Sequence, residues 1–273
     1  MPRVATDTRH GSVSMQELSP VLFIGHGNPM NAIAPNGFRT AWQDVARTLP
    51  RPQAILCVSA HWETQYPQVC TADPPATIHD FYGFPPELFA QRYAAPGAPQ
   101  LLGAVQACVG DGEVSASLQW GLDHGAWCVL QALYPEADIP VAQLSLARSF
   151  APARHFSFAR QLASLRRQGV LVLCSGNIVH NLGRMRQAGP YDWAQRFDAR
   201  VARALEQEDT DALVDYARAG DDAALAVPTP EHYLPLLYAA ALRQPGDRLS
   251  FFAEGFDLAA ISMRSLQLRG AAA

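Results

Sequence analysis

The sequence predicts an α/β fold, a single domain whose mostly parallel central sheet is covered by helices on both faces. Short apolar runs that end in turn residues alternate with stretches of helical periodicity, and this alternation is typical of parallel sheets. The length of 273 residues leaves one or two domains open, but no linker, repeat or low-complexity tract divides the chain. We therefore expect one domain over residues 19–273, preceded by a flexible polar tail over residues 1–18.

The first elements follow from the spacing of apolar residues. Buried strands are expected at residues 21–25, 54–60, 140–146 and 170–175, where apolar runs stop at turn residues. One helix is expected from Asn36 to Pro50, with apolar residues at spacings of three and four, and another over residues 125–134. Strands and helices therefore alternate through the first two thirds of the chain.

The last third contains the longest helical region and two further strands. Over residues 191–219, Trp193, Phe197, Val201 and Leu205 repeat every four residues, which favours a stripe facing the core over a cofactor-binding aromatic group. Residues 249–255 and 261–268 alternate in polarity, which indicates two closing antiparallel strands.

Composition and charge exclude several classes of protein. Hydrophobic residues make up 49% and charged residues 17% of the chain, which argues against disorder. A net charge of −4 provides no basic surface for nucleic acid. The five cysteines lack Cys-x-x-Cys spacing, and no apolar run reaches the roughly 18 residues that a membrane span needs. The start of the chain also lacks the apolar segment of a secretory signal. We expect a reducing, cytoplasmic location with no membrane or nucleic-acid partner.

Two of the eight histidines stand at strand ends. His26 follows the run over residues 21–25, and His61 follows the run over residues 54–60. In open α/β sheets, ligands bind outside the carboxyl ends of the strands, so the two imidazoles are candidate metal ligands. The alternative is that each histidine only caps its strand through backbone hydrogen bonds.

Two more histidines are expected near the same edge. His180 follows the run over residues 170–175 and is expected about one turn into the next helix. His124 follows Asp123, which can cap the helix after it. A helix N-terminus disfavours an imidazolium, so His124 is expected to stay neutral, as a general base requires. A loop histidine without a partner is the alternative for His124.

The segment around His232 leaves two candidate ligands. Thr229 fits an N-cap, Pro230 the first helical position, and Glu231 and His232 the first turn of a helix. The favourable interaction of a carboxylate with the helix dipole already explains Glu231. His232 has no such structural explanation, and either residue could be a ligand.

The remaining histidines differ in their surroundings. His79 lies in an aromatic loop rich in Gly and Pro, residues 77–85, which could line or cover a pocket for a flat ligand. An ordinary packed loop is the alternative. His155, in a polar helical stretch, is expected in solvent, and His10 is expected to be disordered, so neither is assigned a role.

Six segments, in this order, resemble the class III extradiol ring-cleavage dioxygenases, most closely the 4,5-DOPA extradiol dioxygenases of bacteria and plants. The resemblance spans about residues 20–268, and six ordered motifs are more specific than any one of them. The segments are GHGNPM at 25–30, SAHW at 59–62, TIHDFYGFP at 77–85, GLDHGAW at 121–127, SGNIVHNL at 175–182 and PTPEHYLPLLY at 228–238.

The resemblance implies a single extradiol dioxygenase-like catalytic domain with one mononuclear non-haem metal ion. It implies metal binding by His26, His61 and His232, and it makes His180 either a fourth ligand or an acid–base group. His124 matches the histidine that takes the proton of the substrate. In the protocatechuate-cleaving relatives the third ligand is a glutamate, so the presence of His232 beside Glu231 is a departure that leaves the third ligand open. We also expect substrate contacts from His79, Asp123 and Asn177.

The implied reaction is ring opening of a catechol, DOPA-like or other, with O₂. One divalent ion per chain is expected, Fe(II) for activity, while Zn(II) would also suit an all-histidine site in the isolated protein. Two alternatives remain at this stage, a zinc-dependent hydrolase that uses His124 or Glu231 as base, and a non-catalytic binding protein. A monomer or small homo-oligomer is expected.

Overall fold

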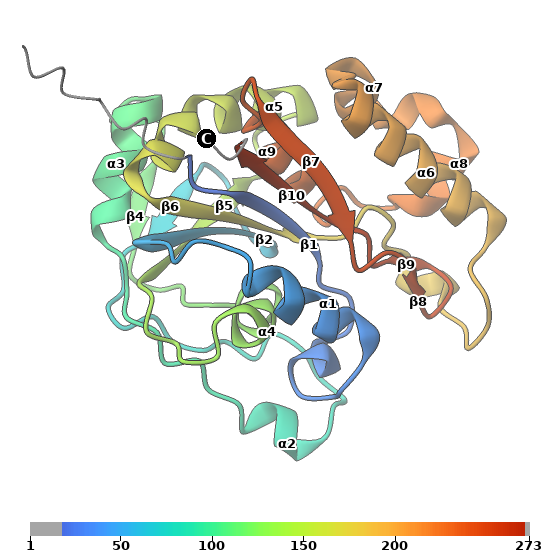
Figure 1. Ribbon diagram of the computed structural model, residues 1–273, viewed down its shortest axis with the longest axis horizontal. Helices are drawn as coiled ribbons and strands as arrows, with labels where there is room; N and C mark the ends of the chain where they lie inside the picture. Colours follow the sequence, from blue (N-terminus) through green and yellow to red (C-terminus); the bar gives the residue numbers. More distant parts are fainter. Residues whose placement is uncertain (1–17, 271–273) are drawn as a thin grey trace, which may run out of the picture.

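A computed structural model describes residues 18–270, and its centre is one eight-stranded sheet (Figure 1). The strand order is β4-β3-β5-β2-β6-β1-β10-β7, in which β5, β2, β6 and β1 are parallel neighbours. The eight strands are β1 (Val21–Gly25), β2 (Ala54–Thr64), β3 (Gln68–Cys70), β4 (Ser115–Ser117), β5 (Val141–Ala147), β6 (Val170–Gly176), β7 (Asp247–Phe252) and β10 (Ser265–Gly270). The predicted parallel centre of the sheet is confirmed.

Helices cover both faces of this sheet (Figure 1). Leu22 and Ile24 of β1 face a core shared with helices α1 (Gly37–Ala46) and α4 (His124–Leu133). Val21 and Phe23 face the opposite core, which lies under α3 (Gln100–Val109), α5 (Pro152–Gln161), α6 (Asp192–Gln207) and α9 (Leu234–Ala241). Both faces of the central strands are therefore apolar, as the continuous hydrophobic runs predict.

Short elements complete the described chain. They are the 3₁₀ turns η1 (Pro29–Ala32), η2 (Leu162–Gln168), η3 (Leu182–Arg184) and η4 (Tyr216–Ala219), the helices α2 (Pro86–Phe89), α7 (Thr210–Val214) and α8 (Asp221–Ala226), and a separate pair of strands, β8 (Phe256–Asp257) and β9 (Ile261–Ser262). None of the helices within residues 18–270 is long and apolar enough to cross a membrane. The predicted tail lies outside the described residues except for Leu18, and so does His10.

The predicted helical region over residues 191–219 is divided into three. Helix α6 ends where Glu208 adopts a left-handed conformation, with φ of 56°, and the side chain of Asp209 then caps α7 by accepting from the Ala212 amide. The apolar stripe is confirmed, because Phe197, Val201 and Leu205 are buried. The region is helical without being one helix.

The two closing strands are antiparallel, but the second one is interrupted. Strand β10 pairs with β1 and β7, whereas β9 pairs with β8 in the separate small sheet. Asp198 accepts hydrogen bonds from the hydroxyl of Ser262, the last residue of β9, at 2.5 Å and from Nε of Arg264, just before β10, at 2.9 Å. These side-chain bonds lie where the strand is interrupted.

His155 is buried, which contradicts the expectation that it lies in solvent. Its Nδ1 lies 3.1 Å from the hydroxyl oxygen of Tyr238 in α9. Phe158 and Leu162 follow at helical spacings of three and seven, and both are fully buried, so His155 belongs to the core-facing stripe of α5. Its polar sequence neighbours lie on the other side of the helix.

Candidate active site

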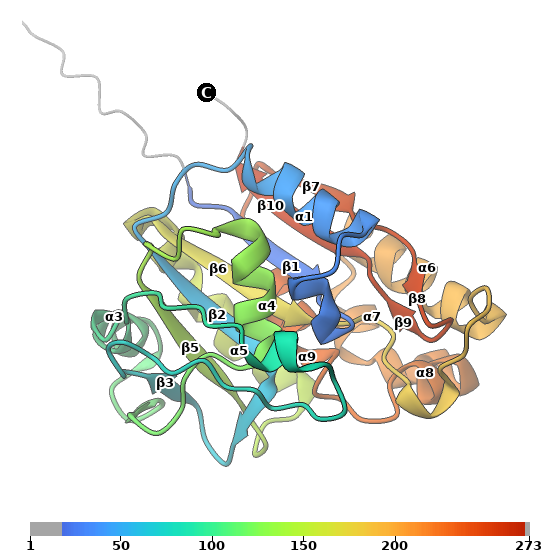
Figure 2. The same ribbon diagram turned by 90° about the horizontal axis from the view of Figure 1, so that it is seen from below.

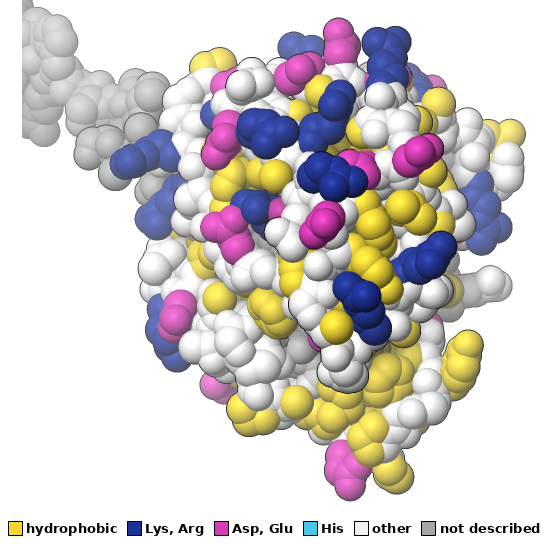
Figure 3. Space-filling model, turned by 90° about the vertical axis from the view of Figure 1, so that its right-hand side faces the viewer, with side chains coloured by type: hydrophobic (Ala, Val, Ile, Leu, Met, Phe, Trp, Pro, Cys, Tyr) yellow, Lys and Arg dark blue, Asp and Glu magenta, His cyan; other side chains and the backbone are white. Residues whose placement is uncertain are grey.

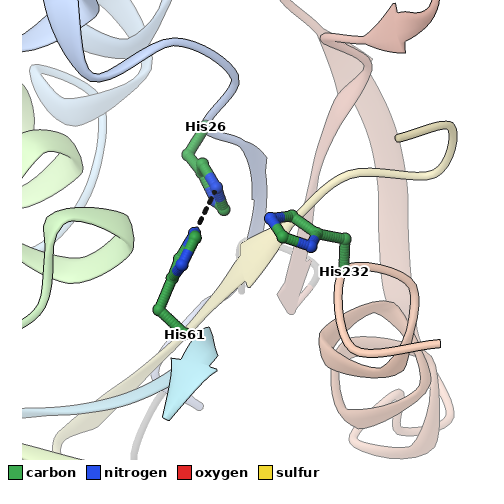
Figure 4. Close-up of side chains that lie close together, drawn as sticks. All are labelled: His26, His61 and His232. Carbon is green, nitrogen blue, oxygen red and sulfur yellow. Dashed lines mark hydrogen bonds between the residues drawn. The ribbon is translucent and has the colours of Figure 1, made fainter. Parts of the chain in front are cut away.

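Three histidines from separate elements lie together at the carboxyl edge of the sheet (Figure 4). His26 follows β1, His61 lies in the last part of β2, and His232 lies in the turn before α9. The Nε2 atoms of His26 and His61 are 3.1 Å apart. The ring centre of His232 lies 5.3 Å from that of His26 and 4.9 Å from that of His61. The convergence expected from the strand ends is present in the structure.

His61 reaches this edge through an irregularity in β2. The strand was expected to end at Ala60 but continues to Thr64, and its register with β5 shifts between Val58 and Glu63. Such a shift redirects the side chains on a strand and is common beside active sites. His61 therefore lies within a strand, not after one.

A hydrogen-bond chain orients the ring of His26. The Ser175 hydroxyl at the end of β6 donates to the carbonyl of Gly125 over 2.5 Å. The oxygen of Ser175 therefore accepts from Nδ1 of His26, at 3.0 Å. With the proton on Nδ1, the lone pair of Nε2 is directed toward His61.

Carboxylates orient the other two rings. Nδ1 of His61 lies 3.4 Å from Oδ2 of Asp80, and Nδ1 of His232 lies 3.2 Å from Oε1 of Glu231. A carboxylate accepts the Nδ1 proton of a neutral imidazole and leaves its Nε2 unprotonated. All three Nε2 lone pairs then converge on one region.

The chemistry of this group fits a metal cation. Two imidazole lone pairs at 3.1 Å repel each other unless a cation or proton lies beside them, and the buried Nε2 of His232 has no hydrogen-bond partner among the described residues. Burial, together with the charges of the neighbouring histidines, holds the pKa of His26 and of His232 well below the usual range. Burial is also the main reason that the pKa of His61 falls to about 3. Neutral, unprotonated imidazoles are the form that binds divalent ions.

Glu231 lies on the outer side of His232. Its Oε1 accepts from the Thr229 hydroxyl at 2.7 Å and faces Nδ1 of His232. The expected helix start at Pro230 is wrong, because α9 begins at Leu234. The carbonyl of His232 accepts from the backbone amide of Asn177 at 2.8 Å, so it takes no part in a first helical turn.

His180 stacks directly on His232. The two ring centres are 3.4 Å apart and the planes differ by 7°. His180 lies in a loop that bridges to Ile261, not in the first turn of a helix as expected. Burial lowers its pKa to about 4, although Glu231 acts in the opposite direction. It forms a potential ligand group with Glu231 and His232 and lies outside the group of His26, His61 and His232.

His124 has a partner that the sequence analysis missed. It is the first residue of α4, which Asp123 caps as expected, and its Nδ1 lies 3.0 Å from Oδ2 of Asp80. Its ring centre is 3.9 Å from that of His61. The alternative of a loop histidine without a partner is therefore wrong. Burial opposes ionisation of Asp80, but the hydrogen bond and charge of His124 and the charge of His61 outweigh it, so the pKa of Asp80 falls to about 2.

Asp123 is buried and bound by three neighbouring groups. Its side chain is fully buried and accepts from the Ser59 hydroxyl at 2.7 Å and from Nε2 of Gln143 at 2.8 Å. A third bond, from the Ala126 amide, caps α4. These bonds tie Asp123 to the start of α4, next to His124, and the substrate contact expected from the sequence stays a prediction.

His79 and Asn177 also lie outside the histidine group. His79 donates through Nε2 to the carbonyl of Gln91 at 3.1 Å and packs against Trp127. Asn177 is buried, and its Nδ2 donates to the carbonyl of Ser262 at 2.8 Å. Its Oδ1 has no hydrogen-bond partner among the described residues. Both hold neighbouring segments in place, and the Oδ1 of Asn177 has capacity for a further bond.

An aromatic segment forms the outer layer on the α4 side of the sheet (Figures 1 and 2). Residues 77–85 and α2 place the ring of Phe81 edge-on to His124, with ring centres 5.7 Å apart, and Tyr82 is 92% exposed. Figure 3 shows hydrophobic side chains gathered on the lower part of the molecule, at the level of α2 in Figure 1. The residues next to His124 therefore suit a flat, partly apolar molecule.

The site contains neutral imidazoles whose lone pairs converge at the carboxyl edge of a parallel sheet, and a histidine bound to a carboxylate lies next to them. This arrangement defines the site of a metal-dependent enzyme. Comparison with known proteins identifies its family. Residues 20–254 match the model described as the catalytic LigB subunit of aromatic ring-opening dioxygenase. The chain belongs to this family, and the resemblance found in the six motifs is confirmed.

The relatives cover most of the chain. It is 42% identical over 256 residues to a 4,5-DOPA dioxygenase extradiol of Escherichia coli (strain K12), covering 91% of this chain and 94% of that protein. A protein of the same name from Beta vulgaris is 38% identical over 232 residues, covering 82% and 86% of the two chains. The crystal structure of an uncharacterised protein from Escherichia coli K12 has a TM-score of 0.78 and 39% identity, covering 91% and 99%. The chain is an extradiol-type aromatic ring-opening dioxygenase, and thus an oxidoreductase.

Proposed function

We propose that this enzyme opens the ring of a catechol with O₂, using one Fe(II) ion held by His26, His61 and His232. The observation that carries the proposal is the convergence of three Nε2 atoms, one of which is buried without a hydrogen-bond partner within residues 18–270. Since relatives at 42% and 38% identity are named for 4,5-DOPA, the proposed substrate is a catechol with a DOPA-like side chain. Small-molecule catechol and O₂ are then the only partners that the reaction needs.

The bound metal would supply open positions for both reactants and a route for electron density from the ring to oxygen. The residues around it hold the ligand rings. Ser175 fixes His26, Asp80 fixes His61, and Glu231 fixes His232. Glu231 supports His232 from outside in this proposal and is not itself the third ligand. The same three nitrogens would also hold Zn(II) in isolated protein.

His124 is the proposed base. Its Nδ1 proton is held by Asp80, so Nε2 can accept a proton from a catechol hydroxyl. His180, stacked on His232, is the second proton-handling candidate and the candidate fourth ligand of the resting enzyme. The aromatic segment over residues 77–85 would pack against the substrate ring and help to determine which side chain the substrate can carry. Asn177, through its free Oδ1, remains the proposed polar contact.

Family membership sets aside the non-catalytic binding protein and the zinc hydrolase as primary functions. We place the enzyme in a reducing, cytoplasmic compartment, because all five cysteines are free and Cys57, Cys70, Cys128 and Cys174 are buried. A monomer or small homo-oligomer remains our expectation for its assembly.

Oxygen uptake under ferrous reconstitution tests the proposal. Metal-free protein is loaded anaerobically with Fe(II), and O₂ consumption is followed with DOPA and with catechols that carry shorter or neutral side chains. We expect uptake with catechols in the iron-loaded protein, fastest with DOPA, and none in the zinc-loaded control, because Zn(II) has no redox chemistry. Absence of uptake with every catechol at full iron occupancy would contradict the proposed function.

A further inference from the structure

Asp80 joins the two histidines that the proposed function treats separately. Its Oδ1 accepts from the backbone amide of His124 at 2.8 Å. Its Oδ2 faces Nδ1 of His124 at 3.0 Å and Nδ1 of His61 at 3.4 Å. The side chain is 19% exposed. One carboxylate therefore lies between a proposed metal ligand and the proposed base, and both of its oxygens are used.

The backbone around Asp80 is fixed to the helix that carries His124. The amide of Ile78 donates to the carbonyl of Leu122, and the amide of Leu122 donates to the carbonyl of Ala76, both over 2.7 Å. Nε1 of Trp127 in α4 donates to the carbonyl of Ile78 at 2.8 Å. These bonds lie two to four residues before Asp80 and at the start of α4. The carboxylate and the imidazole of His124 are therefore positioned by the same part of the fold, which limits their relative movement.

We propose that Asp80 is a positioning residue that fixes the tautomer of both rings, so that His61 presents Nε2 to the metal and His124 presents Nε2 to the substrate hydroxyl. This inference rests on the proposed function. When the catechol O–H bond breaks, the proton forms a new bond with Nε2 of His124 and the bonding electron pair stays on oxygen. The imidazolium that results keeps its Nδ1 proton against Asp80, where the negative carboxylate stabilises it.

Asp80→Asn is the informative variant, because the amide keeps the size of the side chain and removes its charge. Glu87→Gln in α2 is the matched control, since Glu87 follows the aromatic segment over residues 77–85 and, among the described residues, its carboxylate contacts no histidine. At saturating Fe(II), we expect kcat of Asp80→Asn to fall roughly 10- to 100-fold, as is usual for outer partners of metal-bound histidines, and that of Glu87→Gln to stay unchanged.

A comparison of two substrates separates positioning from general damage. A catechol acidified by a ring nitro group is already ionised at neutral pH and does not need a base. We therefore expect the loss of kcat in Asp80→Asn to be several-fold smaller with the acidified catechol than with an unsubstituted one. In a His124→Phe background, Asp80→Asn should lower kcat by a smaller factor than in the wild type, because only its effect through His61 remains. Equal losses with the two catechols, or a full additional loss in that background, would overturn the inference.

Nitrogen-15 NMR of zinc-loaded protein with labelled histidines reads the tautomers without any turnover. We expect the proton of neutral His124 on Nδ1 in the wild type and its transfer toward Nε2 in Asp80→Asn, with His124→Phe identifying the signal. An unchanged tautomer, or a second zinc ion per chain with Asp80 as its ligand, would overturn the inference. If the tautomer depends on Asp80 but no catechol is opened, the proposed function fails while the positioning role stands.

Discussion

His232 and Glu231 are neighbours in the sequence but differ in what their side chains face. Nε2 of His232 is buried and has no hydrogen-bond partner in the described part of the chain, whereas Glu231 is bound to the Thr229 hydroxyl and faces Nδ1 of His232. We expect His232→Ala to lose its metal. Glu231→Ala should keep one ion per chain but bind it roughly 10- to 100-fold more weakly, because an outer partner is lost. Metal analysis after dialysis distinguishes the two, and full metal content in His232→Ala with loss in Glu231→Ala would make the carboxylate the ligand.

His124 offers a second test at the level of single residues. Its ring lies beside His61 but outside the group of three converging nitrogens. We expect His124→Phe to retain its metal and to lose turnover by roughly 10²- to 10⁴-fold, the usual contribution of general acid–base catalysis. Metal content and kcat are measured on the same preparation. Normal turnover with full metal content would exclude His124 as the base.

The sequence could identify the histidines but not all of their partners. His26, His61 and His232 could be found because strand ends and a recognisable motif mark them. Asp80 was missed although it directly follows His79, because a carboxylate in a loop carries no periodic or capping signal of its own. The expectation that His155 lies in solvent was wrong for a different reason. Its sequence neighbours are polar and gave no indication that its own position faces the core.

At the level of elements, the contact between β6 and the turn before α9 positions His232. Gly176 ends β6, and a Cβ atom at this position would lie 2.2 Å from the carbonyl oxygen of His232. We expect Gly176→Ala to displace that turn, to cost about 1–3 kcal/mol of unfolding free energy as overpacking does, and to weaken metal binding. Urea unfolding and a zinc titration measure the two effects. Gly189→Ala is the control, because a Cβ there meets no atom of the described residues within 4 Å. Unchanged zinc affinity in Gly176→Ala would contradict the argument.

Strands and helices could be predicted where one apolar pattern decides them. Strand β1 was expected at residues 21–25 and is found there, and α1 begins after Asn36, whose side chain accepts from the Arg39 amide. The pattern failed where long-range bonds decide the structure. Helix α9 starts late, where Pro235 has no amide proton for the Glu231 carbonyl and the His232 carbonyl bonds to Asn177. Strand β9 separates from β10 beside bonds to Asp198.

For the molecule as a whole, burial of His155 makes stability depend on pH. Burial lowers its pKa to about 4, below its usual value near 6.5. Between these values the unfolded chain binds a proton that the folded protein does not, so stability falls as pH drops from about 6.5 to about 4. Urea unfolding measures this effect. From pH 7 to pH 4, the unfolding free energy of the wild type should fall, relative to that of His155→Phe, by on the order of 3 kcal/mol. A constant difference would exclude a buried neutral His155.

The position of the bound metal is the sharpest test of the proposed active site. Crystals of zinc-loaded protein, with anomalous scattering recorded at the zinc edge, locate each bound ion independently of any activity. We predict one peak per chain, about 2.0–2.1 Å from the Nε2 atoms of His26, His61 and His232. The described residues hold two other groups with the spacing of metal ligands, one with Asp80 and His124 and one with His180 and Glu231. A peak in either of those groups, and none among the three converging nitrogens, would contradict the account.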